Sequence, residues 1–515
     1  MEHVVSLDGN TISPAEVMAV VMGDAGLELT DDAWARIINS RKVVDKILSS
    51  DEVVYGINTG FGSLVDTIIP TDELQKLQLN LIRSHATGLG EKMDAHAVRA
   101  MMIARINSFA KGYSGVHPNV VQQLIDFVNM HITPHVPRIG SLGASGDLAP
   151  LSHMALALIG EGNVIGVEGD LLETRKVLND NGLIPIELQA KDGLSLINGT
   201  SQMLGYSIIA LDMLNSLLPL ADVIYGASLD AFRGTVTPTD HRVHDARPHP
   251  GQLVVAARMR AIMLGSEILE SHKQCDKVQD PYSFRCAPQV HGAVYEALTG
   301  MQSTIFTELN STTDNPLVFP STSTEGEQIV SQGNFHGEIL GLCADRMALA
   351  LFELGSISER RMDQLLDSSK SNLPPFLARN SGLESGLMIV QYSAGASLGE
   401  LHGHAAPRSA FSTSTSAGQE DHVSMGATAC WNLHQACLRI SEVLACELLI
   451  AAEALSHNEN LPSPIVRSLI KLTRGVSPKL DNDRTTSVEL NEIAARLRDG
   501  SWLSRIEAEN TKLPR

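Results

Sequence analysis

Three long apolar stretches constrain the fold of this chain more than any other feature of its sequence. Residues 338–361 and 429–457 are rich in Leu, Ala, Met and Glu, with few Gly or Pro interruptions, as strong helix formers should be. Residues 203–227 are apolar on several faces and form the best candidate for a membrane span. Four residues that would be costly in hydrocarbon interrupt this run, so we expect a helix buried in a protein core instead: Asp212, Asn215, Pro219 and Asp222.

Apolar residues elsewhere also recur at helical rather than strand spacing. Only Val4–Leu7 and residues 163–167 are plausible strands, so the sequence predicts an all-α (mainly α) fold with small β elements in its head region. Helices that are apolar on several faces favour a bundle that continues across subunits. Weakly marked boundaries suggest a head of residues 1–200, a helical body of residues 201–460 and a helical tail of residues 461–515.

Charge and cysteine content exclude several classes of function. The 515 residues include 39 Lys plus Arg and 59 Asp plus Glu, a formal charge of −20, which argues against a nucleic-acid partner. The N-terminus has acidic residues where a secretory leader would be basic, so we expect a cytoplasmic protein with no membrane partner. The six cysteines lack a C-x-x-C pair and read as buried thiols rather than a disulfide framework: Cys275, Cys286, Cys343, Cys430, Cys437 and Cys446.

The segment GSLGASGDLAPL, residues 140–151, contains the residues needed to build an electrophile from backbone atoms. Because Gly146 has no side chain, its amide nitrogen can approach the Ala144 carbonyl, and Ser145 can then lose water across its Cα–Cβ bond. The product would be a methylidene-imidazolone ring, which allows electron-sink chemistry with no external cofactor. The alternative is that Ser145 or Asp147 simply caps the helix that follows.

Matching motifs occur along nearly the whole chain. GASGDLAPLSHMAL resembles the ammonia-lyases and aminomutases that carry a self-formed 4-methylidene-imidazol-5-one, and the other blocks follow in that family's order. The resemblance implies a homotetramer whose long central helix bundle is of the aspartase/fumarase-like type. The other matching blocks contain Tyr55, Ser84, His85, Asn198, Gln279, Tyr282, Arg285, Asn315, Phe335 and Glu420.

Within the family, the Ser84-His85 pair and Glu420 resemble the members that convert L-histidine to trans-urocanate and ammonia, the first step of histidine degradation. Two alternatives stay open. One is a sister lyase or 2,3-aminomutase acting on tyrosine, phenylalanine or a modified imidazole amino acid. The other is a catalytically inactive helical scaffold, against which intact Ser145, Tyr55 and Arg285 argue.

The resemblance implies a role for each polar residue of the expected site. Tyr55 would remove the weakly acidic β-proton, with its pKa lowered from about 10. Arg285 would bind the substrate carboxylate in a bidentate fork, and Asn198 and Gln279 would donate to a developing oxyanion or to the amine. By residue type alone, Tyr55 could equally pack against a turn, and Arg285 could form a structural ion pair.

Two aromatic residues complete the expected catalytic set. The resemblance places Tyr282 beside Gln279 and Arg285, in the motif VQDPYSFRC. It places Phe335 beside the prosthetic ring, which this side chain would hold by packing. An ordinary core aromatic is equally compatible with Phe335.

Substrate choice depends on His85 and Glu420. An imidazole needs one accepting and one donating partner, and a histidine with a carboxylate meets that need. Met388 matches the pocket methionine of the histidine-specific members. The alternatives are a core histidine at position 85 and a space-filling methionine at position 388.

The chain departs from the family pattern between Glu400 and Ser412. The unusual residues there are Leu401, His402, Ala406 and Phe411, and Gln332 replaces a usual glycine. These changes put in doubt either the substrate or the packing behind Glu420. His402 and His404 alone are weak metal ligands without a matching carboxylate or thiol set, so no metal site is expected.

Overall fold

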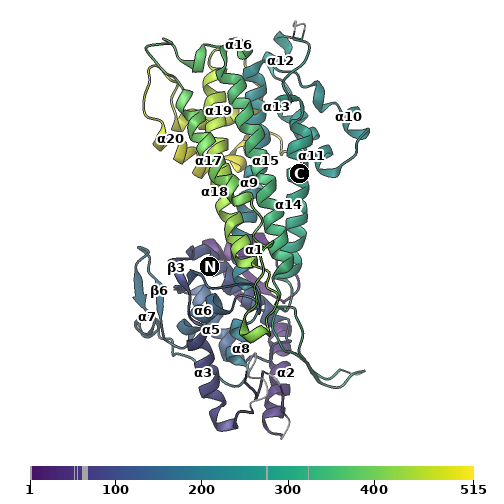
Figure 1. The fold of residues 1–515 in the computed structure, drawn as a ribbon, viewed down its shortest axis with the longest axis vertical. Coiled ribbons are helices and arrows are strands. Elements are labelled where there is room, and N and C mark those ends of the chain that lie inside the picture. The colour runs from purple at the N-terminus through teal and green to yellow at the C-terminus, as the bar shows by residue number, and fades with distance from the viewer. Residues whose placement is uncertain are drawn as a thin grey trace. The chain divides into compact units, whose positions relative to one another are not determined.

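The computed structural model describes residues 3–50, 53–54, 56–60, 68–273, 277–322 and 324–514, which form two compact units (Figure 1). Unit 1 comprises Met1–Ile209, Gln302–Asp345 and Arg408–Trp431, and unit 2 comprises Ala210–Met301, Arg346–Pro407 and Asn432–Arg515. The predicted head falls within unit 1 and the predicted tail within unit 2, whereas the predicted body contributes to both.

Unit 1 is helical, with small sheets between its helices. Its helices are α1 (Pro14–Met22), α2 (Asp31–Leu48), α3 (Leu74–His85), α4 (Ala95–Ala110), α5 (Pro118–Asn129), α6 (Leu148–Leu158), α7 (Thr174–Asp180) and α8 (Asp192–Ile197). The strand pairs are parallel β1 (Val4–Leu7) with β2 (Gly26–Leu29), and antiparallel β3 (Leu89–Lys92) with β5 (Pro137–Ile139) and β8 (Leu317–Phe319) with β9 (Gln328–Val330). A three-stranded sheet has the order β4 (Thr133–Pro134), β6 (Asn163–Ile165), β7 (Leu171–Glu173).

Local sequence explains where these helices begin. Ser13 and Glu16 form a capping box at the start of α1, and the Thr30 side chain accepts a hydrogen bond from an amide of α2. Helix α4 is buried from Ala97 to its end, because Ala, Met and Ile line nearly every face. The predicted strands at residues 4–7 and 163–167 are confirmed as β1 and β6, the latter two residues shorter than predicted.

Four long helices contribute residues to both units: α9 (Ser201–Phe232), α14 (Ala287–Leu309), α15 (Glu338–Leu366) and α18 (Gly426–Leu455). The other helices of unit 2 are α10 (His241–Asp245), α11 (Pro250–Met263), α12 (Glu267–Ser271), α13 (Tyr282–Arg285), α16 (Ser368–Ser371), α17 (Met388–Ala405), α19 (Pro464–Val476), α20 (Ser487–Arg498) and α21 (Ser501–Glu509). The all-α prediction and its three long helices are confirmed.

A buried ion pair links the long helices within unit 2. Arg361 of α15 donates to both carboxylate oxygens of Glu447 on α18, at 2.5 and 2.8 Å, and both side chains are fully buried. Ser228 of α9 and Ser358 of α15 also donate to Glu447, at 2.7 and 2.5 Å. Every lone-pair direction of this carboxylate is therefore used, as a buried charge requires.

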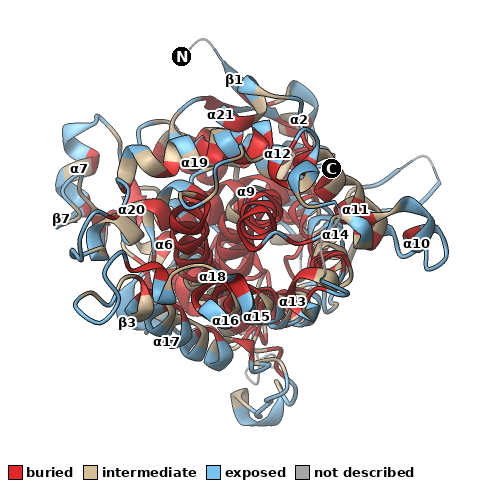
Figure 2. Ribbon diagram, turned by 90° about the horizontal axis from the view of Figure 1, so that it is seen from above, coloured by how far each residue is buried: buried red, intermediate tan, exposed pale blue. Residues whose placement is uncertain are grey.

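Helix α9 is long and apolar enough to cross a membrane by length and composition alone. However, 78% of its most apolar window is buried inside the protein, and Figure 2 shows the helix coloured as buried along most of its length. This agrees with the predicted core helix. The described cysteines form no disulfide with one another, and three of them are buried: Cys430, Cys437 and Cys446. Cys275 lies outside the described residues.

Candidate active site

The chain makes a tight turn at Ala144, Ser145 and Gly146, which we call the electrophile turn. Gly146 has a φ of +73° and forms a parallel bridge with Gly199, whose carbonyl accepts a 2.8 Å hydrogen bond from the Asp147 amide. A Cβ atom on Gly146 would lie only 2.2 Å from the Gly199 oxygen. Both the backbone angle and the close approach therefore require glycine at this position.

The Asp147 side chain accepts hydrogen bonds from groups near the turn and does not cap the helix that follows it. It precedes α6, but its side chain makes no capping hydrogen bond there. Instead it accepts from Ser141 Oγ at 2.8 Å and from the amides of Gln202 and Met203 at 2.8 and 3.1 Å. Burial raises the pKa of the Asp147 carboxyl to about 7, and these hydrogen bonds oppose that rise.

Ser145 does not cap α6 either, because its hydroxyl points to a carboxylate far along the chain. Ser145 Oγ donates to Glu420 Oε1 at 2.6 Å, and Thr415 Oγ1 donates to Glu420 Oε2 at 2.8 Å. The backbones of Thr415 and Glu420 form an antiparallel bridge. Two predicted site residues, 275 positions apart, are thus in direct contact, and the capping alternative is wrong for both Ser145 and Asp147.

His85 is the last residue of α3, and its contacts indicate which ring nitrogen carries the proton. Its Nδ1 lies 2.8 Å from the Leu81 carbonyl oxygen, which can only accept, so Nδ1 carries the proton and Nε2 keeps a lone pair. Ser84 Oγ donates to the same carbonyl at 3.1 Å. Burial lowers the pKa of His85, although the Leu81 carbonyl and the charge of Glu420 act in the opposite direction. A neutral ring with Nε2 as acceptor follows.

Asn198 follows α8 directly and is only 4% exposed. Its Oδ1 has no hydrogen-bond partner among the described residues. An unpaired buried amide oxygen is costly unless a further group meets it. Asn198 therefore has an amide oxygen that is unpaired within the described chain, and it directly precedes Gly199, which pairs with Gly146 of the electrophile turn.

Arg105 of α4 is a buried cation that the sequence interpretation missed. Its Nη2 donates to the Ser195 carbonyl at 2.5 Å, whereas Nε and Nη1 have no partner in the described part of the chain. A Cβ atom on Gly199 would lie 2.3 Å from Arg105 Nη1. Burial lowers the Arg105 pKa to about 10, so the guanidinium stays charged at neutral pH. A signal in the sequence was available, because Arg105 lies in a mainly apolar helical stretch, as does Arg99.

Phe335 lies half-buried in a turn before α15, in a loop that Gln332 organises. The Gln332 amide donates to Asn315 Oδ1 at 2.8 Å, and its side chain donates to the Asp314 carbonyl at 2.6 Å. Gln332 also accepts a hydrogen bond from the Asn334 amide. The departure from glycine at position 332 therefore has a structural role close to Phe335.

Four further predicted residues belong to unit 2: Gln279, Tyr282, Arg285 and Met388. Gln279 and Tyr282 are exposed, the latter by 71%, and the Arg285 guanidinium lies 4.7 Å from the centroid of the Tyr282 ring. Among the residues that the structure describes, no carboxylate pairs with Arg285, which argues against a structural ion pair. Met388 is half-buried at the start of α17. Tyr55 lies outside the described residues, so its role stays a prediction.

Of the unusual residues at 400–412, only Leu401 is packed in the core, and Ala406 is exposed. Leu401 is fully buried in unit 2, and His402 is exposed with its ring edge-on to Phe352, at 5.1 Å between centroids. His404 Nδ1 lies 2.6 Å from Asn432 Oδ1, a partner that leaves this nitrogen no free lone pair for a metal. Phe411 is 59% exposed in unit 1.

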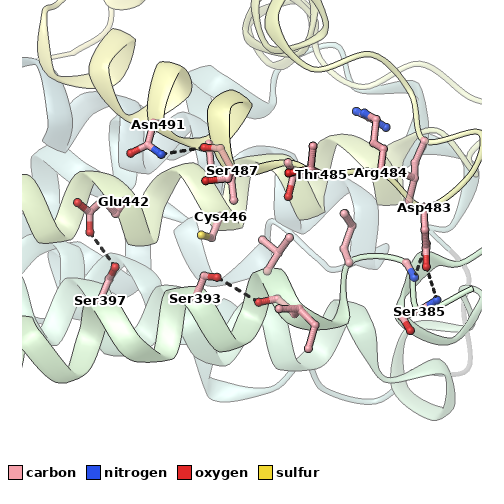
Figure 3. Close-up of a pocket in the computed structure, with 17 residues that line it drawn as sticks. Ser385, Ser393, Ser397, Glu442, Cys446, Asp483, Arg484, Thr485, Ser487 and Asn491 are labelled. Atoms are coloured by element: carbon pink, nitrogen blue, oxygen red, sulfur yellow. Dashed lines mark hydrogen bonds between the residues drawn. The ribbon is translucent and has the colours of Figure 1, made fainter.

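A cavity of about 610 Å³ lies in unit 2, between α17, α18 and the segment before α20 (Figure 3). Asp483 closes one end by accepting from the amides of Ser385 and Gly386, at 2.7 and 2.9 Å. The described residues that line it include none of the predicted site residues. We therefore choose the candidate active site by the chemistry of the electrophile turn and not by cavity size.

Comparison with known proteins shows the family of this chain. Residues 12–475 match the family model of aromatic amino acid lyases. The chain is 42% identical to histidine ammonia-lyase of Myxococcus xanthus over 503 residues, covering 98% of each protein. Its structure is similar to histidine ammonia-lyase from Trypanosoma cruzi, with a TM-score of 0.91, 38% identity and coverage of 98% and 95% of the two chains. It is also similar to tyrosine aminomutase from Streptomyces globisporus, with a TM-score of 0.93, 34% identity and coverage of 99% and 100%. The chain therefore belongs to the aromatic amino acid lyase family.

Proposed function

We propose that this chain is a carbon–nitrogen lyase that converts L-histidine to trans-urocanate and ammonia. The observation that carries the proposal is the contact of Ser145 with Glu420, beside a His85 ring whose Nε2 is an acceptor. The relatives named histidine ammonia-lyase, which match the chain over nearly its whole length, support the same substrate.

The electrophile turn fits a self-formed 4-methylidene-imidazol-5-one. Gly146 approaches Gly199 too closely for any side chain, and ring closure onto Ala144 also needs a residue without a side chain at this position. The unpaired Asn198 Oδ1 and the charged Arg105 lie beside Gly199. When formed, the group would supply the electrophile that activates the substrate amine. No external cofactor is proposed.

Glu420 and His85 would bind the substrate ring. In the unmodified chain, the Ser145 hydroxyl occupies Glu420 Oε1, so loss of that hydroxyl as water would leave this oxygen as an acceptor. His85 Nε2 is an acceptor as well. The sequence predicts one accepting and one donating partner for the substrate ring. The two acceptors, Glu420 Oε1 and His85 Nε2, instead complement an imidazolium ring, which donates from both nitrogens. A positive ring would also make the adjacent β-proton more acidic.

The other site residues would act on the rest of the amino acid. Arg285, with no carboxylate partner among the described side chains, would bind the substrate carboxylate, and Gln279 and Tyr282 would accompany it. Asn198 would meet the amine or the developing oxyanion, and Phe335 would pack against the ring of the electrophile turn. Tyr55 would take the β-proton, and Met388 would line the substrate pocket.

A homotetramer is part of the proposal. Apolar side chains of α15 and α17 are exposed in the single chain: Ile339, Leu342, Leu349, Ile389 and Tyr392, by 50 to 66%. Exposed apolar surface of this kind usually marks an interface. Light scattering coupled to gel filtration would give four chains per particle. A cytoplasmic location without nucleic-acid or membrane partners remains the expectation from charge and composition.

The decisive experiment compares wild type with Ser145→Ala. Wild type should form urocanate from histidine, and its intact mass should be lower than the sequence mass by two waters. Ser145→Ala keeps the turn but cannot lose the second water, so we expect turnover to fall by at least about 1000-fold with unchanged circular dichroism. Retention of about a tenth of wild-type turnover would contradict the electrophile assignment.

A second candidate is an aminomutase acting on tyrosine or phenylalanine, favoured by the structural similarity to tyrosine aminomutase. Incubation with each amino acid separates the candidates, because an aminomutase yields a β-amino acid and a lyase releases free ammonia. We expect histidine to be the best substrate and free ammonia to match urocanate in amount. A β-amino acid as the main product would favour the second candidate.

A further inference from the structure

We propose that His336, Glu338 and His422 form a binding site for a divalent metal of the Zn²⁺ class. One potential ligand atom from each residue lies within 4.8 Å of the other two. His336 lies two residues before Glu338, the first residue of α15, and His422 lies before α18, so two distant segments of unit 1 meet here. Neither the sequence interpretation nor the proposed lyase chemistry uses these three residues.

The cluster is incompletely satisfied as it stands. His422 Nε2 and Glu338 Oε2 are 3.8 Å apart, which is too long for a hydrogen bond. Glu338 Oε2 is buried and has no hydrogen-bond partner among the described residues. A buried carboxylate oxygen without a partner is unfavourable, and a cation that binds it directly would remove that cost.

The two imidazoles lie face to face. The His336 and His422 rings are stacked, with planes 5° apart and centroids 5.6 Å apart. His336 Nε2 lies 3.4 Å from the His422 carbonyl oxygen, which is long for a hydrogen bond. Neutral imidazoles carry the lone pairs that a transition metal requires.

Ser412 provides the outer contact that orients a metal-binding histidine. Its Oγ lies 3.3 Å from His422 Nδ1 and accepts a hydrogen bond from the Val423 amide at 3.0 Å. The second lone pair of Ser412 Oγ can accept the Nδ1 proton of His422. The Nε2 lone pair then faces Glu338, as in other sites where a hydrogen-bonded histidine binds zinc through its second nitrogen.

The donor set selects the class of metal. Two imidazoles and one carboxylate suit Zn²⁺, Co²⁺ or Ni²⁺, whereas Ca²⁺ and Mg²⁺ prefer oxygen ligands. Bonds of about 2.0 to 2.2 Å place the ligand atoms of a tetrahedral site about 3.4 Å apart. The three side chains must therefore close by side-chain rotation from their present spacing. The His422 side chain is 67% exposed, which leaves room for this rotation and for a water as fourth ligand.

A metal here would connect two segments that carry proposed site residues. His336 follows Phe335, and His422 lies two residues after Glu420. Binding at His336, Glu338 and His422 would stabilise the folded chain and restrain both segments. An effect on KM for histidine would rest on the proposed function, but metal binding itself does not.

The test titrates chelator-treated, full-length protein with ZnCl₂ by calorimetry and with CoCl₂ by visible absorption. We expect one Zn²⁺ ion to bind per wild-type chain. Bound Co²⁺ should give the visible absorption spectrum of an ion with a low coordination number. His422→Asn and Glu338→Gln should each weaken Zn²⁺ binding at least 100-fold. His402→Ala removes an exposed histidine elsewhere and should bind Zn²⁺ like wild type.

Two further comparisons keep the result independent of folding and of catalysis. The variants should match wild type in circular dichroism and in particle size, and His422→Asn changes an exposed side chain if Glu338→Gln fails to fold. Ser145→Ala, which cannot make the electrophile, should still bind one Zn²⁺. Absence of Zn²⁺ binding by wild type, or equal binding by wild type and His422→Asn, would overturn the proposed metal site without affecting the lyase assignment.

Discussion

The electrophile turn of unit 1 and helix α13 of unit 2 both carry predicted site residues, but the surroundings of these residues differ. Around the turn, Gly146, Asp147 and Gly199 are held by close backbone approach and buried hydrogen bonds. On α13, Tyr282 is exposed, and Arg285 has a ring contact and no carboxylate partner in the described chain. The first region builds its geometry before any substrate arrives, whereas the second presents groups whose partner is expected to be the substrate.

Changing Gly146 should break the turn and produce the largest effect. In Gly146→Ala, a methyl group would meet the Gly199 carbonyl at 2.2 Å while the backbone keeps φ near +73°. We expect a loss of about 3 kcal/mol or more in unfolding free energy and no loss of two waters from the mass. Urea unfolding and intact mass spectrometry measure both.

Gly182→Ala is the matched control for the turn. Gly182 has a φ of +71°, but nothing lies within 4 Å of its added Cβ. Only backbone strain remains, so the expected cost is about 1 to 2 kcal/mol, with the water loss retained. Equal destabilisation by the two substitutions would show that the contact with Gly199 is unimportant.

Arg285→Lys should separate function from stability on α13. A lysine keeps the charge but cannot form the bidentate fork, so we expect kcat/KM for histidine to fall by about 100-fold or more. The unfolding free energy should change by less than about 0.5 kcal/mol. Arg242→Lys, in an exposed ion pair with Asp240, should leave both quantities unchanged. A kcat/KM near wild type would remove Arg285 from carboxylate binding.

Glu420→Gln tests a residue that touches the turn and also serves the substrate. The amide keeps the size but loses the negative charge, so an imidazolium ring would bind less well. We expect kcat/KM to fall by about 10- to 100-fold through KM more than kcat, with prosthetic-group formation intact. Parallel kinetics at several histidine concentrations and intact mass would show this. A Glu420→Gln mass without water loss would instead place Glu420 in ring formation.

The smallest expected effect is a change in the pH dependence of stability. The folded pKa of His85 lies below its unfolded value of about 6.5, so the unfolded chain binds more protons between the two pKa values. The contribution of His85 is therefore complete above about pH 6.5 and is lost as pH falls through that interval. His85→Gln should reduce the slope of the unfolding free energy against pH by an amount that corresponds to at most one bound proton. Urea unfolding from pH 5 to 8 measures this slope. An identical slope for wild type and variant would contradict burial as the cause.

Local sequence was sufficient for the elements whose physics is local. Helical periodicity over 338–361 and 429–457 predicts α15 and α18, because a helix face repeats within a few residues. The short strands β2, β3, β4, β5, β7, β8 and β9 were not predicted, since two- to four-residue ladders depend on a partner elsewhere in the chain. In the same way, Gln332 looked like a departure from a motif until its hydrogen bonds to Asn315 and Asp314 were seen.

The sequence by itself indicated the covalent chemistry that we propose and predicted the long helices. Ala144, Ser145 and Gly146 are adjacent, so their capacity to form a ring is readable without coordinates. Tertiary structure alone decided that Glu420 meets Ser145, that Arg105 lies buried beside Gly199, and that His336 faces His422. Those pairs are separated by dozens to hundreds of residues. Their contacts arise from core packing, which no local pattern encodes.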